Sequence, residues 1–121
     1  MAQFRYIVAD VDQAVSFYCE QLGLELIEQY GPAMAIVRRG DLDLWLAGPS
    51  ASAAKPMPDG TKPEPGGWNR CVLIVDNFDE LVGSLRKAGV QFRKEVTRGP
   101  GGKQILCEDP SGNVLELFEP D

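Results

Sequence analysis

The chain has 121 residues, of which 44% are hydrophobic and 25% charged, and its formal net charge at pH 7 is −6. This length suits one globular domain with its own core, and the acidic balance argues against nonspecific nucleic-acid binding, which needs a basic surface. The chain has no apolar run of membrane-spanning length and no signal-peptide pattern, so we expect a cytoplasmic protein without a membrane partner.

The chain contains no histidine and three cysteines. The lack of histidine excludes Ser-His-Asp and Cys-His catalysis, and it removes the commonest ligand for zinc, nickel or iron. Cys19, Cys71 and Cys107 do not have the spacing of metal ligands, so they are expected to be buried, reduced thiols.

The first unit of the chain, residues 1–47, has the pattern of a strand, a helix and three further strands. Asp10, followed by Gln13, is expected to cap the helix, and Gly23 is expected to end it. The four expected strands are residues 2–9, 24–30, 34–39 and 42–47. Short turns join the last three strands, which predicts an antiparallel meander.

Residues 48–68 follow without any periodicity and contain five of the nine prolines. A connection of this length is either a linker or a flap over a binding site. Met57 and Trp68 are its only large apolar side chains. They either fix the loop to the surface or line a cavity.

The second unit, residues 69–121, repeats the element order of the first. Asn77 takes the place of Asp10 as the expected helix cap, and Gly89 again ends the helix. The expected strands are residues 70–75, 90–96 and 103–108, with a last strand after residue 113. This repeat predicts an α+β fold made of two βαβββ modules with pseudo-twofold symmetry, within a single domain of residues 1–121.

A turn, Asp109-Pro110-Ser111-Gly112-Asn113, precedes the last strand. Pro110 presets its own φ, and Gly112 and Asn113 tolerate left-handed backbone, so the chain reverses here. Glu116 follows on the strand, with apolar neighbours on its own face. It is therefore either solvent-facing or placed in a cavity.

One helix covers one face of each four-stranded sheet, and the open faces are expected to enclose a cleft. Alternation along the strands assigns the following residues to that cleft: Gln3, Arg5, Ile7, Asp43, Trp45, Arg70, Val72, Ile74, Glu116 and Phe118. The candidate ligand-binding residues are Gln3, Arg5, Trp45, Trp68, Arg70, Glu116 and Phe118.

The repeated unit resembles the vicinal-oxygen-chelate superfamily, which groups glyoxalases, extradiol dioxygenases, fosfomycin-resistance proteins and bleomycin-resistance proteins. The runs that carry the resemblance are Val8-Ala9-Asp10 to Phe17-Tyr18, Leu22-Gly23-Leu24, Ile74-Val75-Asp76 to Leu85, Ala88-Gly89-Val90, and above all Glu108 to Asn113 leading into Glu116-Leu117. The resemblance implies a curved mixed-sheet cup that holds a small-molecule ligand, often in a homodimer.

Metal-using members of this superfamily resemble one another in four cup positions, on the first and last strand of each module. By position, these fall on Gln3, Trp45, Arg70 and Glu116. Trp and Arg cannot coordinate a metal, so we expect no cofactor, with Arg70 paired to Glu116 in the metal's place. The alternative is a divalent metal held by Gln3, Asp43 and Glu116, with a dimer able to supply ligands from both chains.

Three functions are compatible with these observations. The first is metal-free binding of an aromatic or cationic drug or metabolite, similar to that of bleomycin-resistance proteins, because Trp45, Trp68 and Phe118 offer aromatic faces. Trp45 has an equally good explanation as core filling between the sheets. The second is a glyoxalase-like lyase or isomerase with Glu116 as metal ligand or catalytic general base. The third is a non-catalytic structural or regulatory domain whose loop 48–68 contacts a partner.

Overall fold

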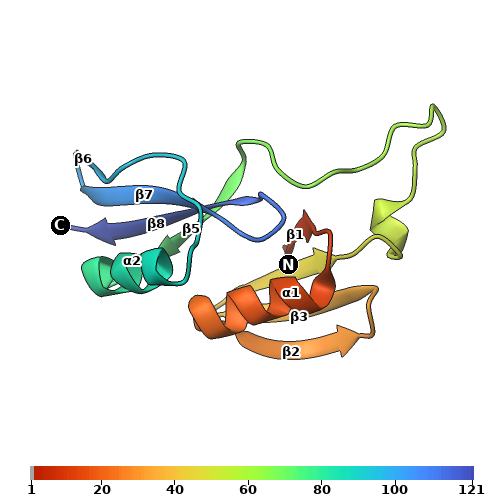
Figure 1. Ribbon diagram of the computed structural model, residues 1–121, viewed down its shortest axis with the longest axis horizontal. Helices are drawn as coiled ribbons and strands as arrows, with labels where there is room; N and C mark the ends of the chain where they lie inside the picture. Colours follow the sequence, from red (N-terminus) through yellow and green to blue (C-terminus); the bar gives the residue numbers. More distant parts are fainter. Residues whose placement is uncertain (1) are drawn as a thin grey trace.

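The first module of the computed structural model, which describes residues 2–121, is a four-stranded sheet with helical turns on one face (Figure 1). Met1, at the start of the expected module 1–47, lies outside the described residues. The elements are β1 (Phe4–Ile7), α1 (Val11–Ser16), the π-helical turn η1 (Phe17–Gln21), β2 (Glu25–Tyr30), β3 (Met34–Arg39) and β4 (Leu42–Ala47). The strand order is β1-β4-β3-β2, with β1 parallel to β4 and the other pairs antiparallel.

The second module repeats this arrangement. Its elements are β5 (Arg70–Ile74), α2 (Phe78–Lys87), β6 (Thr97–Gly99), β7 (Gly102–Glu108) and β8 (Val114–Pro120). The strand order is β5-β8-β7-β6, the same order as in the first sheet. The predicted α+β fold of two βαβββ modules is therefore confirmed.

The helix caps differ between the two modules. Asp10 caps α1 as predicted, because its Oδ1 accepts a hydrogen bond from the backbone N–H of Gln13 at 2.9 Å. Asn77 makes no such side-chain bond. The Phe78 N–H instead donates to Glu119 Oε2 at 2.9 Å, so a carboxylate from β8 satisfies the start of α2.

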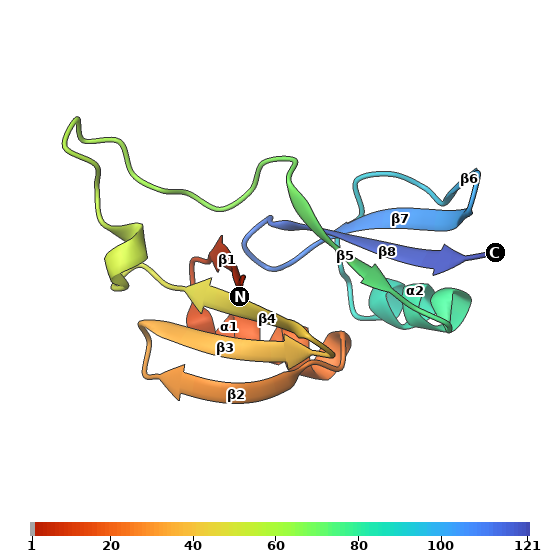
Figure 2. The same ribbon diagram turned by 180° about the vertical axis from the view of Figure 1, so that it is seen from behind.

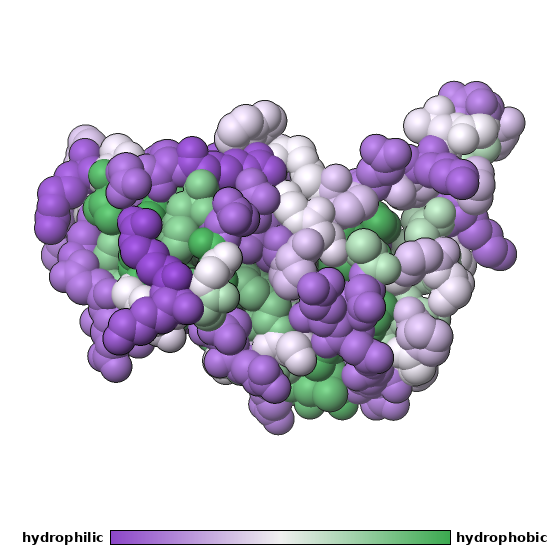
Figure 3. Space-filling model, viewed as in Figure 1, coloured by the Kyte–Doolittle hydropathy of each residue, from purple (hydrophilic) through white to green (hydrophobic). Residues whose placement is uncertain are grey.

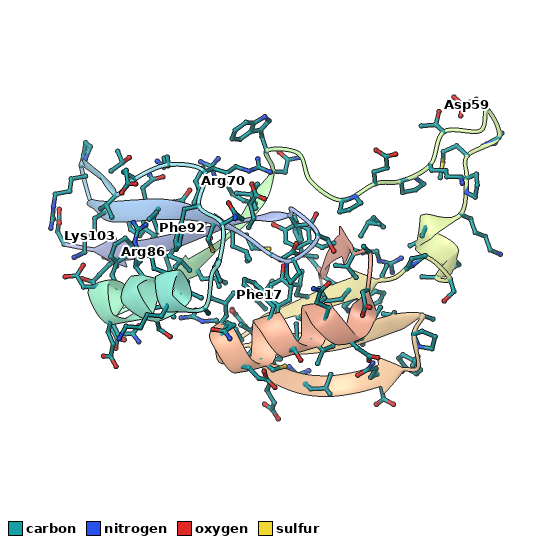
Figure 4. The ribbon with its side chains drawn as sticks, in the orientation of Figure 1. Phe17, Asp59, Arg70, Arg86, Phe92 and Lys103 are labelled. Carbon is teal, nitrogen blue, oxygen red and sulfur yellow. The ribbon has the colours of Figure 1, made fainter. Side chains whose placement is uncertain are left out.

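The predicted strand 90–96 is wrong. This segment makes one isolated bridge, Phe92 to Cys107, and the fourth strand of the sheet is the three-residue β6. Residues 91–93 run antiparallel to the end of β7, because the Glu108 N–H donates to the Gln91 carbonyl at 2.9 Å and the Arg93 N–H donates to the Leu106 carbonyl at 3.0 Å, but the pairing goes no further. Phe92 packs against the core, and the guanidinium carbon of Arg86 lies 4.8 Å from the centre of its ring (Figure 4). Val96 is left exposed, so its apolar side chain does not mark a buried face.

Each helix packs on one face of the sheet of its own module. In Figure 1, α1 lies in front of β3 and β4 and α2 lies beside β8, and in the reverse view of Figure 2 β3 and β4 lie in front of α1. The core lies between helices and sheets, where Tyr18, Leu44, Leu85, Leu115 and Leu117 are fully buried. The opposite face of each sheet carries no helix and is called here the open face.

The turn 109–113 joins the two modules. Asn113 Nδ2 donates to the carbonyl of Ile7 at 2.8 Å, and the hydroxyl of Tyr18 donates to Asp109 Oδ2 at 2.8 Å. Tyr6 adds a second junction, because its hydroxyl donates to the Val114 carbonyl and accepts from the Cys71 N–H. These bonds cross the module boundary between buried or half-buried groups, so they fix how the modules sit together.

The loop 48–68 extends away from the two modules and contains only a short 3₁₀ turn, η2 (Ser52–Ala54) (Figure 1). Asp59 lies at its far tip (Figure 4) and accepts a hydrogen bond from the Thr61 N–H at 3.0 Å. The loop returns to the body where the Gly66 N–H donates to Asn113 Oδ1 at 2.9 Å. Across residues 2–121, no helix has both the length and the apolar character needed to cross a membrane.

Candidate functional site

The open face of the first sheet carries Arg5 beside Trp45. The two residues are partners in the β1–β4 register, and the Arg5 guanidinium carbon lies 4.9 Å from the centre of the Trp45 ring. Trp45 is half-buried, and Arg5 is exposed. The pair offers a cation and an aromatic ring on one surface, an arrangement that suits stacking of a planar group.

Gln3 and Asp43 lie together at one end of this face, in a hollow of about 350 Å³ that Arg38 also lines. Arg38 binds Asp43 through two hydrogen bonds, from Nε at 2.6 Å and from Nη2 at 3.0 Å. These bonds hold the pKa of the Asp43 carboxyl below its usual value. Both oxygens of Asp43 are therefore engaged by one guanidinium.

The open face of the second sheet carries the predicted pair of Arg70 and Glu116. Arg70 Nε donates to Glu116 Oε1 at 3.1 Å, and the two side chains are 32% and 11% exposed. Figure 4 places Arg70 where β5 begins, at the side of its sheet that adjoins the first module. Phe118 lies on the same face and pairs in register with Ile74. Val72 and Ile74 are 48% and 52% exposed, so this face is apolar around one ion pair.

Trp68 lies outside both faces, at the end of the loop. Its ring is 70% exposed and stacks on Arg93, whose guanidinium carbon is 4.5 Å from the ring centre. Arg93 also donates to Glu108 Oε2 at 2.8 Å, to the Gly67 carbonyl at 2.6 Å and to the Gly112 carbonyl at 3.0 Å. Arg93 thus fastens the returning loop to β7 and to the turn before β8. Its role was missed, because the sequence pattern of residues 90–96 gives no sign of these partners.

The candidate residues therefore form two groups, one on each sheet. Gln3, Arg5, Asp43 and Trp45 belong to the first group, and Arg70, Glu116 and Phe118 to the second. A separate groove of about 410 Å³ lies between the modules on the helix side and contains none of these residues. Figure 3 shows this side, where apolar patches lie between the modules amid a largely hydrophilic surface, and Figure 4 shows Phe17 of the groove facing the second module.

The alternative metal set of Gln3, Asp43 and Glu116 does not fit a divalent ion. Both carboxylates are already paired with arginine, and the guanidinium beside each carboxylate repels a cation. Within the described residues, no three His, Cys, Asp or Glu side chains gather closely enough to hold a metal.

The cysteines offer no activated nucleophile. All three are free thiols; Cys71 and Cys107 are buried as predicted, whereas Cys19 is only half-buried. Burial raises the pKa of the Cys107 thiol to about 12 and also raises that of Cys71. A thiol with a raised pKa is protonated at neutral pH and is a poor nucleophile.

The profile of the Glyoxalase/Bleomycin resistance protein/Dioxygenase superfamily matches residues 1–117. The chain has no significant match among curated proteins.

Similar solved structures include a lactoylglutathione lyase from Agrobacterium tumefaciens, with 21% identity and a TM-score of 0.77 over 98% of this chain and 92% of that one. The antibiotic-binding protein TnmS3 from Streptomyces sp. CB03234 is 26% identical, with a TM-score of 0.70 over 100% and 97% of the two chains. The fosfomycin resistance protein FosX from Listeria monocytogenes is 16% identical, with a TM-score of 0.75 over 100% and 93%. Together with the paired βαβββ modules, the profile match shows that this chain belongs to the Glyoxalase/Bleomycin resistance protein/Dioxygenase superfamily.

Proposed function

We propose that this protein binds a small organic molecule on its open sheet faces without a metal. The observation that carries the proposal is the hydrogen bond from Arg70 to Glu116 at 3.1 Å. By position, these two residues correspond to metal ligands in the metal-using members of the superfamily. Here the Glu116 carboxylate is hydrogen-bonded to the guanidinium of Arg70 instead. The charge that a metal would supply is then supplied by the protein itself.

The likeness to an antibiotic-binding protein at 26% identity supports a binding role. The aromatic side chains on the open faces support a ligand with a planar ring system, because Trp45 and Phe118 present ring surface to it. The expectation of a cationic ligand has less support, since the carboxylates nearest these rings are paired with arginine.

We further propose that two copies of the chain complete the site as a homodimer. Small-molecule sites are concave, and the two groups of candidate residues lie on separate open faces. Ile74 is 52% exposed on one of these faces, so a second copy would bury apolar surface there. Light scattering should give twice the mass of the chain. Ile74→Asp should shift it toward monomer, whereas the control Met57→Asp, at a loop residue that is 48% exposed, should not.

Metal analysis tests the metal-free proposal. The purified protein should contain little nickel, zinc, manganese or iron, and none of these ions should raise its melting temperature. Stoichiometric metal that is lost on Glu116→Gln would refute the proposal. A thermal-shift panel of aromatic compounds tests binding itself, because a ligand that binds only the folded state raises the melting temperature.

One observation favours a lyase or isomerase as the second candidate. Glu116 Oε1 is engaged by Arg70, but Oε2 has no hydrogen-bond partner within residues 2–121. That oxygen is free to remove a proton from a carbon acid, with Arg70 stabilising the oxyanion that forms. In this case Glu116→Gln would abolish turnover and leave substrate binding in place.

A further inference from the structure

Two arginines on the open faces, Arg5 and Arg70, have hydrogen-bond donors without a partner among residues 2–121. The first strand of each module pairs with the last strand of the same module: β1 with β4, and β5 with β8. They carry two open-face carboxylates, Asp43 and Glu116, and each is paired with an arginine. They also carry two open-face arginines, Arg5 and Arg70. The two remaining open-face carboxylates of the first sheet, Glu25 and Glu28, lie on the outer strand β2 and are exposed.

Arg70 uses little of its hydrogen-bonding capacity. A guanidinium has five N–H donors, and only the Nε–H of Arg70 has a partner among residues 2–121, namely Glu116 at 3.1 Å. Both terminal nitrogens remain available, and the side chain is 32% exposed. Arg93 gives the contrast within the same module, because its Nε and both terminal nitrogens are engaged.

The surroundings of these free donors are apolar. Val72 pairs in register with Glu116, and Ile74 pairs with Phe118, so they flank the ion pair on the same face. An arginine fork in an apolar setting binds oxygen anions well, because its two parallel N–H groups match the two oxygens of a carboxylate. Arg5 repeats this combination on the other face, with its guanidinium over Trp45.

We propose that the ligand is an aromatic or apolar ring system that carries an anionic oxygen group, and that Arg70 binds this group through its terminal nitrogens. This inference rests on the proposed function and names its ligand class. It opposes the expectation from net charge, because a chain of charge −6 attracts cations at long range. Around Arg70, the neighbouring carboxylate of Glu116 is already bound to the arginine, so the free donors of the guanidinium favour an anionic group there.

Three probes that share one ring system test the preference: naphthoate, neutral naphthalenemethanol and naphthylmethylammonium. Each is titrated into the isotope-labelled full chain, and binding is followed through the backbone amide signals. Naphthoate should bind at least about tenfold more tightly than the ammonium probe, since a hydrogen bond between charged groups contributes roughly that much. Its binding should shift the signals of β5 and β8.

Variants of Arg70 then test whether this residue binds the anionic group. Arg70→Gln should weaken naphthoate binding about tenfold. The naphthoate affinity of Arg70→Lys should lie between those of the unmodified protein and Arg70→Gln, because lysine keeps the positive charge but lacks the two parallel N–H donors of the guanidinium. Arg98→Gln is the matched control, since Arg98 is exposed on β6, lacks a side-chain partner among the described residues and causes the same charge change. Circular dichroism and melting temperature establish that each variant is folded.

Several outcomes overturn the inference. Equal or tighter binding of the ammonium probe would refute the anionic ligand class while leaving the binding function intact. An equal effect of Arg70→Gln and Arg98→Gln would show that only net charge matters. Conversion of the dimer to monomer by Arg70→Gln, with naphthoate affinity retained, would assign Arg70 to the contact between copies. If no probe of any charge binds at millimolar concentration, the proposed function fails together with this inference.

Discussion

Asp109 is predicted to be one of the most sensitive polar residues of the chain, because its carboxylate holds the junction between the modules. The side chain is 4% exposed and accepts four hydrogen bonds. Oδ1 accepts from the N–H groups of Ser111 and Asn113 at 2.8 and 3.0 Å. Oδ2 accepts from the Tyr18 hydroxyl at 2.8 Å and from Asn113 Nδ2 at 3.0 Å.

The substitution Asp109→Asn keeps the shape of this side chain and replaces one acceptor oxygen with a donor. If the new NH₂ group takes the place of Oδ1, it faces two backbone N–H groups. If it takes the place of Oδ2, the Tyr18 hydroxyl can rotate to accept, but Asn113 Nδ2 still presents a donor. At least one hydrogen bond to a charged acceptor is lost in either orientation, and the others lose their charge. We expect a loss of about 2–4 kcal/mol in the free energy of unfolding, a large part of the roughly 5–15 kcal/mol typical of a domain.

Urea unfolding measures this effect, with the m-value checked for constancy. Tyr18→Phe removes one of the four bonds and should cost about 1–2 kcal/mol, and the double variant should cost less than the sum because the two residues share a bond. Asp41→Asn is the control, since Asp41 is exposed and should change stability by less than about 0.5 kcal/mol. If Asp109→Asn is no more destabilising than this control, the assignment of the junction to Asp109 is wrong.

Three further predictions concern packing and titration. Gly102→Ala should destabilise the fold by a few kcal/mol, because the added Cβ would clash with a backbone carbonyl of β8. Gly83→Ala should instead stabilise the fold by about 0.5–1 kcal/mol, because Gly83 lies on α2 with open space around it. Equal changes in the free energy of unfolding, measured with urea, would contradict this prediction. Among the three thiols of the native protein, a thiol reagent should modify Cys19 first, and mass spectrometry that finds Cys107 modified at a similar rate would contradict the burial. Burial raises the pKa of Cys107 to about 12 and that of Tyr18 well above its usual value, so the unfolded chain loses these protons first. The free energy of unfolding should therefore stay constant below about pH 9 and decrease as the pH rises toward 12. For each of the two groups, the folding equilibrium constant should fall by up to a factor of ten per pH unit. A free energy of unfolding that does not change over this pH range, measured with urea, would contradict the prediction.

The module repeat could be predicted from the sequence because it depends on local signals. Asp10 and Gly23 mark the ends of the first helical segment through capping and left-handed backbone, and the structure keeps both roles. The pair of Arg70 and Glu116 could be predicted as well, since the repeat places both on the open face of neighbouring strands. In each case, a short-range pattern determines where the side chain points.

The contacts that could not be predicted from the sequence all join segments that are far apart along the chain. The Tyr18 hydroxyl reaches Asp109 across 91 positions, and the turn chemistry around Pro110 gives no sign of that partner. Glu119 caps α2 from β8 in place of Asn77, because the carboxylate of a neighbouring strand reaches the helix start. The contacts of Arg93 could not be predicted for the same reason, because its partners lie on the loop 48–68, on β7 and on the turn 109–113.

The turn 109–113 sets the relative placement of the two modules and therefore of their open faces. Its bonds to Ile7 and Tyr18 fix how the two modules sit together, and each module keeps the open face of its own sheet free of helix. A ligand on a single face meets the donors of Arg70 or those of Arg5, together with exposed apolar side chains. In the homodimer that we propose, a second copy covers these faces and excludes water from the ion pair of Arg70 and Glu116. Because hydrogen bonds to charged groups strengthen as water is excluded, affinity for an anionic ligand should depend on dimer formation, and Ile74→Asp should weaken naphthoate binding even though Arg70 is intact.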